Sequence, residues 1–187
     1  ISSIDLVIGG KRKSEIVTKV IDYIQYDTNS NNKNNYKENS DLFLLGRTRA
    51  SIKIQEGCDQ ICSYCIVPRV RGREKSIDHN EIINSINTLV QKGVSEVVLT
   101  GTQLGTYGFE FKNINLSILI KKILDETNIS RLRVSSIQPQ EIDEDLLSNW
   151  RYDTRLCPHF HVPLQSGSEK ILKSKRRKYD LKMYENS

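Results

Sequence analysis

The sequence predicts an α/β fold with a parallel sheet, because short apolar strands alternate with amphipathic helices over most of the chain. Four strand–helix units follow one another after residue 50, and glycines or prolines stand between many of these elements. This alternation is typical of right-handed βαβ units. Such units build either an open doubly wound sheet or part of a βα barrel, and periodicity leaves both alternatives open.

The elements are expected in a regular order. Strands are predicted at 51–55, 94–100, 131–137 and 159–164, and helices at 78–92, 115–127, from 139 to about 150, and from 168 onward. Asp78 and Glu81 form the capping-box pattern of a helix start, and Gly93 supplies a stop. Asp180 is a sound N-cap near the end of the chain.

The first part of the chain has a different organisation. Residues 4–8 are predicted as a strand and a helix is predicted from about Ser14, so residues 1–26 resemble the end of an amino-terminal domain. Residues 27–45 are predicted to be an Asn-rich linker, and residues 46–187 a core that is incomplete at its carboxyl end. The chain begins with Ile1 and its single methionine is Met183, so we expect a fragment of a longer protein.

Composition limits the class of protein. The chain has 187 residues, 37% of them hydrophobic, with 28 Lys and Arg against 23 Asp and Glu, which gives a net charge of +5. These values indicate a globular chain rather than a membrane-spanning or fully disordered one. The four cysteines are too few for a disulfide scaffold and three of them are clustered, so we expect a reducing, cytoplasmic location.

The cysteine cluster is the main chemical signal. Cys58, Cys62 and Cys65 have the spacing C-x3-C-x2-C directly after a predicted strand. Three thiolates can hold three irons of a [4Fe–4S] cluster and leave the fourth iron for S-adenosylmethionine, whose reductive cleavage yields a 5′-deoxyadenosyl radical. The alternative is a zinc site, which needs a fourth ligand such as His79 or Cys157. Cys157 reads more simply as a small buried apolar residue.

Several further blocks keep the order of a known family. The sequence resembles the radical S-adenosylmethionine methylthiotransferases, most of all the tRNA enzymes that act on N6-threonylcarbamoyladenosine, in the segments 46–58, 68–73, 98–101, 133–137, 159–168 and 176–179. The resemblance implies a βα barrel of the radical SAM type and methylthiolation at C2 of adenosine 37. It also implies a second [4Fe–4S] cluster, for which no cysteine precedes Cys58. Gln138 stands where Glu is common in the family, and Lys175 where Met is common.

The resemblance also implies a set of cofactor contacts. Residues that end or follow the predicted strands would bind S-adenosylmethionine, with an aromatic side chain between two cysteines near the adenine. These residues are Tyr64, Gly101, Thr102, Ser136 and Gln165. Their place at the carboxyl ends of strands is where barrel enzymes carry their chemistry.

Two basic runs flank this site and predict contacts with RNA phosphates. They comprise Arg69, Arg71 and Arg73, and Arg176, Arg177 and Lys178. The expected partners are a tRNA anticodon stem-loop and an electron donor such as flavodoxin or ferredoxin, with a monomeric chain and no membrane. The alternatives are another tRNA adenosine, a ribosomal protein aspartate, or a non-catalytic zinc- or cluster-binding RNA module.

Overall fold

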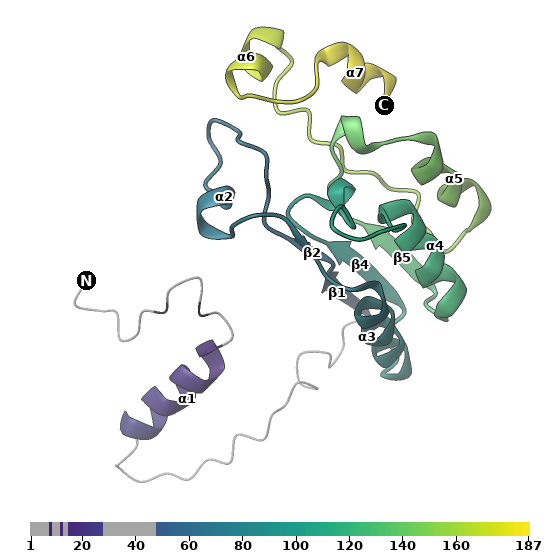
Figure 1. Ribbon diagram of the computed structural model, residues 1–187. Coiled ribbons are helices and arrows are strands. Elements are labelled where there is room, and N and C mark those ends of the chain that lie inside the picture. Colours follow the sequence, from purple (N-terminus) through teal and green to yellow (C-terminus); the bar gives the residue numbers. More distant parts are fainter. Residues whose placement is uncertain (1–7, 9–11, 13–14, 28–47) are drawn as a thin grey trace. The chain divides into compact units, whose positions relative to one another are not determined.

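The computed structural model describes residues 8, 12, 15–27 and 48–187. The chain divides into two compact units, residues 1–43 and 44–187 (Figure 1). In the first unit the helix α1 (Ile16–Asp27) forms close to its predicted start, and Val17 and Ile21 on it are exposed. The strand predicted at 4–8 and the linker predicted at 27–45 lie almost wholly outside the described residues, and the domain boundaries stay predictions.

The second unit is organised around a parallel sheet. Its strands are β1 (Arg49–Lys53), β4 (Glu96–Thr100) and β5 (Arg131–Val134), in the order β1-β4-β5. The order follows the chain without reversal, so right-handed crossovers place their helices on the same face. Successive strands of a βα barrel have this order, as does one half of a doubly wound sheet. The described strands form no closed barrel.

Three helices cover this sheet. They are α3 (His79–Gln91), α4 (Leu116–Glu126) and α5 (Glu144–Tyr152), of which α3 packs on β1 and α4, and α4 packs on α5. Ile86, Leu119 and Ile123 on the helices are fully buried with Val97 and Leu99 of β4. Burial of each such side chain contributes about 1.5–3 kcal/mol. None of the helices in the described part of the chain is long and apolar enough to cross a bilayer.

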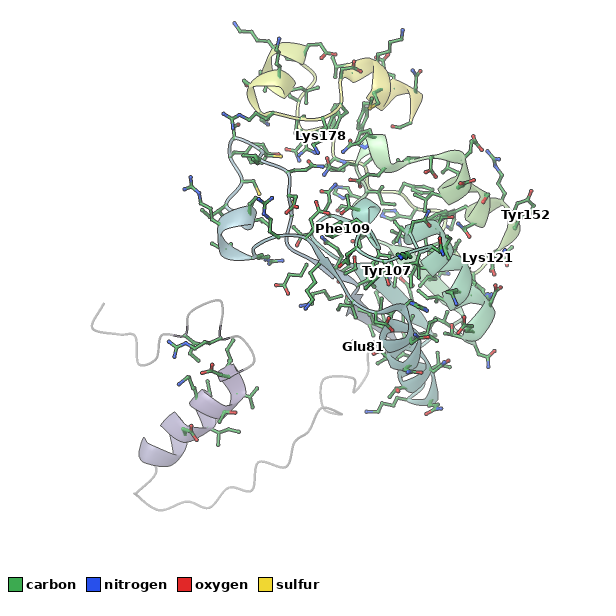
Figure 2. All side chains as sticks on the ribbon, viewed as in Figure 1. Glu81, Tyr107, Phe109, Lys121, Tyr152 and Lys178 are labelled. Atoms are coloured by element: carbon green, nitrogen blue, oxygen red, sulfur yellow. The ribbon has the colours of Figure 1, made fainter. Side chains whose placement is uncertain are left out.

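Each of these helices begins at a side chain that caps it. The carboxylates of Asp78 and Asp143 and the amide oxygen of Asn115 accept hydrogen bonds of 2.8–2.9 Å from the backbone N–H groups of the first turns. Between β4 and α4, the short 3-10 helix η3 (Leu104–Thr106) leads to Tyr107, whose ring lies inside the core (Figure 2). The Tyr107 hydroxyl donates to the backbone oxygen of Ile77 at 2.8 Å.

The strand predicted at 51–55 is divided between β1 and a short antiparallel pair of strands. The chain leaves the sheet at Ile54, and β2 (Gln55–Glu56) pairs in antiparallel fashion with β3 (Lys75–Ser76). The segment between β2 and β3 contains the three clustered cysteines and the short helix α2 (Val67–Val70). The hairpin therefore holds both ends of this segment, here called the cysteine loop (residues 57–74).

Three other predictions about the elements are corrected. β5 ends at Val134 rather than 137. The helix predicted from Pro139 is split into the 3-10 helix η4 (Pro139–Glu141) and α5, because Ile142 and Asp143 are extended and Asp143 caps the new helix. The strand predicted at 159–164 is wrong: two isolated parallel bridges, Leu132 with Leu156 and Ser136 with His161, place this segment beside β5.

The reason for the missing strand lies in its sequence. Pro158 and Pro163 bracket the segment, and neither can donate a backbone N–H to a ladder. The chain then continues into α6 (Glu169–Ser174), which begins after Ser168 as predicted, and α7 (Leu181–Asn186). Asp180 caps α7 by accepting from the N–H of Met183 at 2.7 Å, which confirms its predicted role.

Candidate cofactor site

The predicted site residues come from segments that leave the sheet at one edge. β1, β4 and β5 are parallel, so the cysteine loop, residues 101–103 and residues 135–138 all follow carboxyl ends of strands. Figure 1 shows α2 and α6 at the same end of the sheet, and the backbone N–H of Ser63 donates to the oxygen of Lys175 at 3.3 Å. The site is therefore assembled at the edge where βα barrels carry their chemistry.

The three clustered cysteines are free thiols held by polar contacts. Cys58 is buried, and Cys62 and Cys65 are half-buried. The backbone N–H of Gln60 donates to Cys58 Sγ at 3.4 Å, and Arg177 Nη1 donates to Cys62 Sγ at 3.4 Å. Burial raises the pKa of the Cys58 thiol. Hydrogen-bond donors directed at sulfur orient thiolate ligands and stabilise their negative charge, so these residues fit a cluster.

The zinc alternative would need several ligand side chains around one ion. Among the residues that the structure describes, no three Cys, His, Asp or Glu side chains converge closely enough to hold one metal ion. Zinc needs its ligands on a single ion, whereas a [4Fe–4S] cluster takes each thiolate on a different iron. Cys157 is buried beside β5, where its backbone N–H donates to the oxygen of Leu132 at 2.9 Å, and it packs as an apolar residue.

The loop after β4 is fixed by a buried glutamine. Gln55 Oε1 accepts from the backbone N–H groups of Thr102 at 2.9 Å and Gln103 at 2.8 Å. A Cβ atom on Gly101 would lie 3.0 Å from the backbone oxygen of Gln55, so a side chain here would require the neighbouring atoms to shift by a few tenths of an ångström. The hydroxyl of Thr102 is buried and has no hydrogen-bond partner among the residues that the structure describes. An orphaned hydroxyl at this edge is the kind of group that a polar cofactor such as S-adenosylmethionine would satisfy.

A second set of contacts joins the cysteine loop to the segment before α6. The Tyr64 hydroxyl donates to Gln165 Oε1 at 3.0 Å, and Lys175 Nζ donates to the backbone oxygen of Gln165 at 2.8 Å. Lys175 Nζ also lies 5.4 Å from the centroid of the Tyr64 ring. Gln165 has a φ of +67°, a left-handed conformation that is strained for a residue other than glycine. Strain of this kind is concentrated at functional sites.

The predicted cofactor residues thus fall into three contact groups rather than one. Gly101 and Thr102 lie against Gln55, while Tyr64 bonds to Gln165. Ser136 is exposed, and its Oγ lies 2.7 Å from His161 Nδ1. All three groups follow the same edge of the sheet, and their roles toward a cofactor stay predictions.

The first basic run lies within the cysteine loop, and the second lies after α6. Arg69, Arg71 and Arg73 are exposed, and Arg73 Nη1 lies 3.4 Å from Asp59 Oδ1. Arg69 and Arg176 line a cavity of about 380 Å³, together with Ile61, Cys62, Ser63, Tyr64, Cys65, Ile66 and Pro68. Lys178 is exposed between α6 and α7 (Figure 2). Arg177 differs from these residues, because it is half-buried and contacts the cysteine loop.

Sequence reasoning missed a polar network under the site. Gln103 Nε2 donates to Glu141 Oε1, and Gln138 Nε2 donates to Gln103 Oε1. The backbone N–H of Gln138 also donates to Glu141 Oε2 at 3.0 Å, and burial raises the pKa of Glu141. Gln103 Oε1 lies 3.9 Å from Cys58 Sγ. Glutamines carry no motif of their own, so only the clustering of Gln and Glu after predicted strands could have indicated them.

Comparisons with known proteins identify the family of the chain. The model of the radical SAM superfamily matches residues 52–187. A tRNA-2-methylthio-N6-dimethylallyladenosine synthase from Endomicrobium trichonymphae is 36% identical over 98% of this chain and 42% of its own length. The threonylcarbamoyladenosine tRNA methylthiotransferase of Aquifex aeolicus is 35% identical over 99% of this chain and 46% of its own length, and that of Bacillus subtilis is 33% identical over 98% and 42%.

A solved structure supports the fold. The radical S-adenosylmethionine methyltransferase TsrM from Kitasatospora setae, with cobalamin and a [4Fe–4S] cluster bound, aligns with a TM-score of 0.56 over 72% of this chain and 27% of that chain, at 18% identity. The chain spans less than half the length of the curated relatives described above. The predicted resemblance to the methylthiotransferases is confirmed by these relatives. With the family model matched from residue 52 to 187, the chain belongs to the radical SAM superfamily, whose members use a [4Fe–4S] cluster and S-adenosylmethionine.

Proposed function

We propose that this chain is the radical SAM part of a tRNA methylthiotransferase that installs a methylthio group at C2 of N6-threonylcarbamoyladenosine 37. The observation that carries the proposal is the cysteine loop, with three free thiols at the carboxyl edge of a parallel sheet and hydrogen-bond donors on two of the sulfurs. The names of the Aquifex and Bacillus relatives support the transferase class and the substrate.

In this proposal, Cys58, Cys62 and Cys65 hold the cluster. When bound, the cluster and S-adenosylmethionine supply a 5′-deoxyadenosyl radical that can abstract hydrogen from an unactivated carbon. The chain's own residues bind and orient S-adenosylmethionine. The backbone at Gly101 and the orphaned hydroxyl of Thr102 offer polar contacts to the methionyl part of the cofactor.

Tyr64 provides an aromatic surface for the adenine in the same proposal. Its hydroxyl is already occupied by the bond to Gln165, so the ring is held in one orientation. Lys175 holds the backbone of Gln165, because its Nζ donates to the backbone oxygen of Gln165. These contacts join the cysteine loop to the segment before α6. Two segments held together at the site would shield a reactive intermediate from water.

The exposed arginines support an RNA substrate. Arg69 and Arg176 line the same cavity as Cys62 and Cys65, so phosphate contacts would place a nucleotide beside the cluster. Arg71, Arg73 and Lys178 extend the positive surface around it. We also expect a cytoplasmic monomer that receives electrons from a flavodoxin or ferredoxin.

The name of one relative supports a second candidate substrate, N6-dimethylallyladenosine in tRNA. The Endomicrobium relative is named for N6-dimethylallyladenosine, at an identity close to that of the threonylcarbamoyl enzymes. Binding of anticodon stem-loops that carry either modification, or neither, separates these two candidates. We expect the threonylcarbamoyl form to bind more tightly, and preference for the dimethylallyl form would move the assignment to the second substrate. Binding of a ribosomal protein in place of RNA would overturn the tRNA assignment.

The experiment that tests the function starts from anaerobically reconstituted chain with reductant and S-adenosylmethionine. We expect 5′-deoxyadenosine as product. Sulfur insertion is not expected from this chain by itself, because the sequence has no cysteine before Cys58 to hold a second cluster. Absence of 5′-deoxyadenosine from a cluster-loaded chain, or stoichiometric zinc in its place, would contradict the proposed chemistry.

A further inference from the structure

Arg177 has contacts that its place in a basic run does not explain. Nη1 lies 3.4 Å from Cys62 Sγ and 3.4 Å from the Tyr64 hydroxyl, and Nη2 donates to Gln138 Oε1 at 3.0 Å. The guanidinium thus joins the cysteine loop, the loop after β5 and the segment between α6 and α7. Its neighbours Arg176 and Lys178 are exposed.

The orientation of Arg177 is fixed by an aromatic ring. The guanidinium carbon lies 4.9 Å from the centroid of the Tyr179 ring, within the range of a cation–π contact. Tyr179 is itself buried, and its hydroxyl donates to the backbone oxygens of Pro163 at 2.7 Å and Leu164 at 2.9 Å. The side chain is therefore held against Cys62 by a rigid support.

The charge of Arg177 is left without an anionic partner of its own. Within the described part of the chain, no carboxylate forms an ion pair with this guanidinium, and its Nε is buried with no hydrogen-bond partner. The partner at Nη2 is the neutral amide of Gln138. An arginine stays protonated in proteins, and a buried charge is costly unless it is compensated. Of the groups in contact with this guanidinium, Cys62 Sγ at 3.4 Å is the one that would carry negative charge as a ligand of the proposed cluster.

We propose that Arg177 is a positioning residue that stabilises negative charge on the Cys62 thiolate and raises the reduction potential of a cluster held by the cysteine loop. This rests on the proposed cluster at Cys58, Cys62 and Cys65. One-electron reduction by an external donor makes a cluster more negative by one charge. A fixed cation beside a ligand sulfur therefore stabilises the reduced state more than the oxidised state.

The test uses the full chain, reconstituted with iron and sulfide and titrated with titanium(III) citrate under EPR. Arg177→Gln removes the charge, whereas Arg177→Lys keeps it. We expect Arg177→Gln to lower the ratio of reduced to oxidised cluster about tenfold at a fixed ambient potential, which equals about 59 mV for a one-electron couple. Arg177→Lys should remain within about threefold of the unaltered chain, or less than 30 mV by the same relation.

Two further variants separate local charge from net charge. Gln138→Glu places a carboxylate next to Nη2, so it should shift the ratio in the same direction as Arg177→Gln without removing the arginine. Lys170→Gln removes one positive charge from exposed α6 and should leave the ratio unchanged. Iron content and thermal unfolding of every variant report whether the cluster and the fold are retained.

The measured potentials and cluster contents of the Arg177 variants each decide the proposal in one direction. Equal potentials for Arg177→Gln and the unaltered chain would overturn the proposal, as would a potential for Arg177→Lys as low as that of Arg177→Gln. Loss of the cluster from both variants in folded protein would show a structural role and would also overturn it. If the unaltered chain binds no cluster at all, it is the proposed function that fails, so the two failures are distinguishable.

Discussion

The hydroxyl of Tyr64 donates a hydrogen bond to Oε1 of Gln165, 3.0 Å away, although 101 positions separate the two residues in the sequence. Tyr64 lies between two of the clustered cysteines, and Gln165 lies in a strained left-handed conformation before α6. The bond closes one side of the candidate site. Two residues that the sequence could only assign separately are thereby in direct contact.

Tyr64→Phe should weaken the binding of S-adenosylmethionine while the ring remains. The hydroxyl contributes about 0.5–1.5 kcal/mol through its bond to Gln165, which corresponds to a rise of about 2- to 13-fold in the dissociation constant. Equilibrium binding to the cluster-loaded chain measures this. Tyr152→Phe is the matched control, because Tyr152 is 87% exposed (Figure 2). Equal affinities for the two variants would contradict a role of the Tyr64 hydroxyl.

Gly57 and Gly72 allow a matched comparison of two alanine substitutions in the cysteine loop. Both have a φ of +77°, but a Cβ on Gly57 would lie 1.9 Å from the backbone oxygen of Arg73, whereas a Cβ on Gly72 meets nothing within 4 Å. Alanine at Gly72 should cost only the left-handed conformation, about 1–2 kcal/mol. Alanine at Gly57 should also force the hairpin apart and reduce iron loading. The free energy of unfolding and the iron content measure both effects, and equal losses would show that the clash is relieved elsewhere.

Gln55→Leu should destabilise the fold strongly. Gln55 is 1% exposed, and its amide bonds to the backbone N–H groups of Thr102 and Gln103 and to the oxygen of Gly57. Each buried backbone group left unpaired costs about 1–3 kcal/mol, so for the three groups we expect a total loss of about 3–9 kcal/mol in denaturant unfolding. Gln91→Leu on the exposed side of α3 should stay within about 0.5 kcal/mol. A loss below about 1 kcal/mol for Gln55→Leu would mean that water replaces these bonds.

Glu141 should make the stability of the fold fall as the pH rises. Burial raises the pKa of Glu141 above its ordinary 4.5, so the folded state binds the proton more tightly than the unfolded state. The resulting stabilisation is fully present below pH 4.5 and is lost as the pH rises through the folded-state pKa. Glu141→Gln does not titrate at this position. The unfolding free energy of the unaltered chain minus that of Glu141→Gln should therefore decrease between acidic and neutral pH.

Urea unfolding at several pH values measures this difference, and exposed Glu185→Gln controls for the removal of one carboxylate. A difference that is constant with pH, or that increases with pH, would contradict burial as the dominant influence on the pKa of Glu141.

The sequence predicts the regular elements well where one physical signal dominates. The helices α3 and α4 carry buried Ile and Leu at helical spacing, and Asp78 caps the first as expected. The strand order could not be predicted, because it depends on pairing between distant strands. Asp143 caps α5, whereas the apolar positions after Pro139 favoured one longer helix.

The three cysteines of the candidate site could be selected from the sequence, whereas the side chains that contact them could not. The spacing of Cys58, Cys62 and Cys65 is local and needs no tertiary information. The buried amides of Gln55 and Gln103 act through contacts between segments far apart in the chain, for which the sequence has no pattern. Arg177 was grouped with an exposed basic run, because charge patterning does not reveal which member of a run faces inward.

The most direct test of the account is the metal content of the anaerobically reconstituted chain, measured together with Cys62→Ala and Cys157→Ala. We expect about four irons per chain, the content of one [4Fe–4S] cluster, in the unaltered chain and in Cys157→Ala. Cys62→Ala should lose the cluster and the cleavage of S-adenosylmethionine. One zinc per chain, or a Cys62→Ala variant that keeps both its iron and its cleavage activity, would contradict the three-thiolate site.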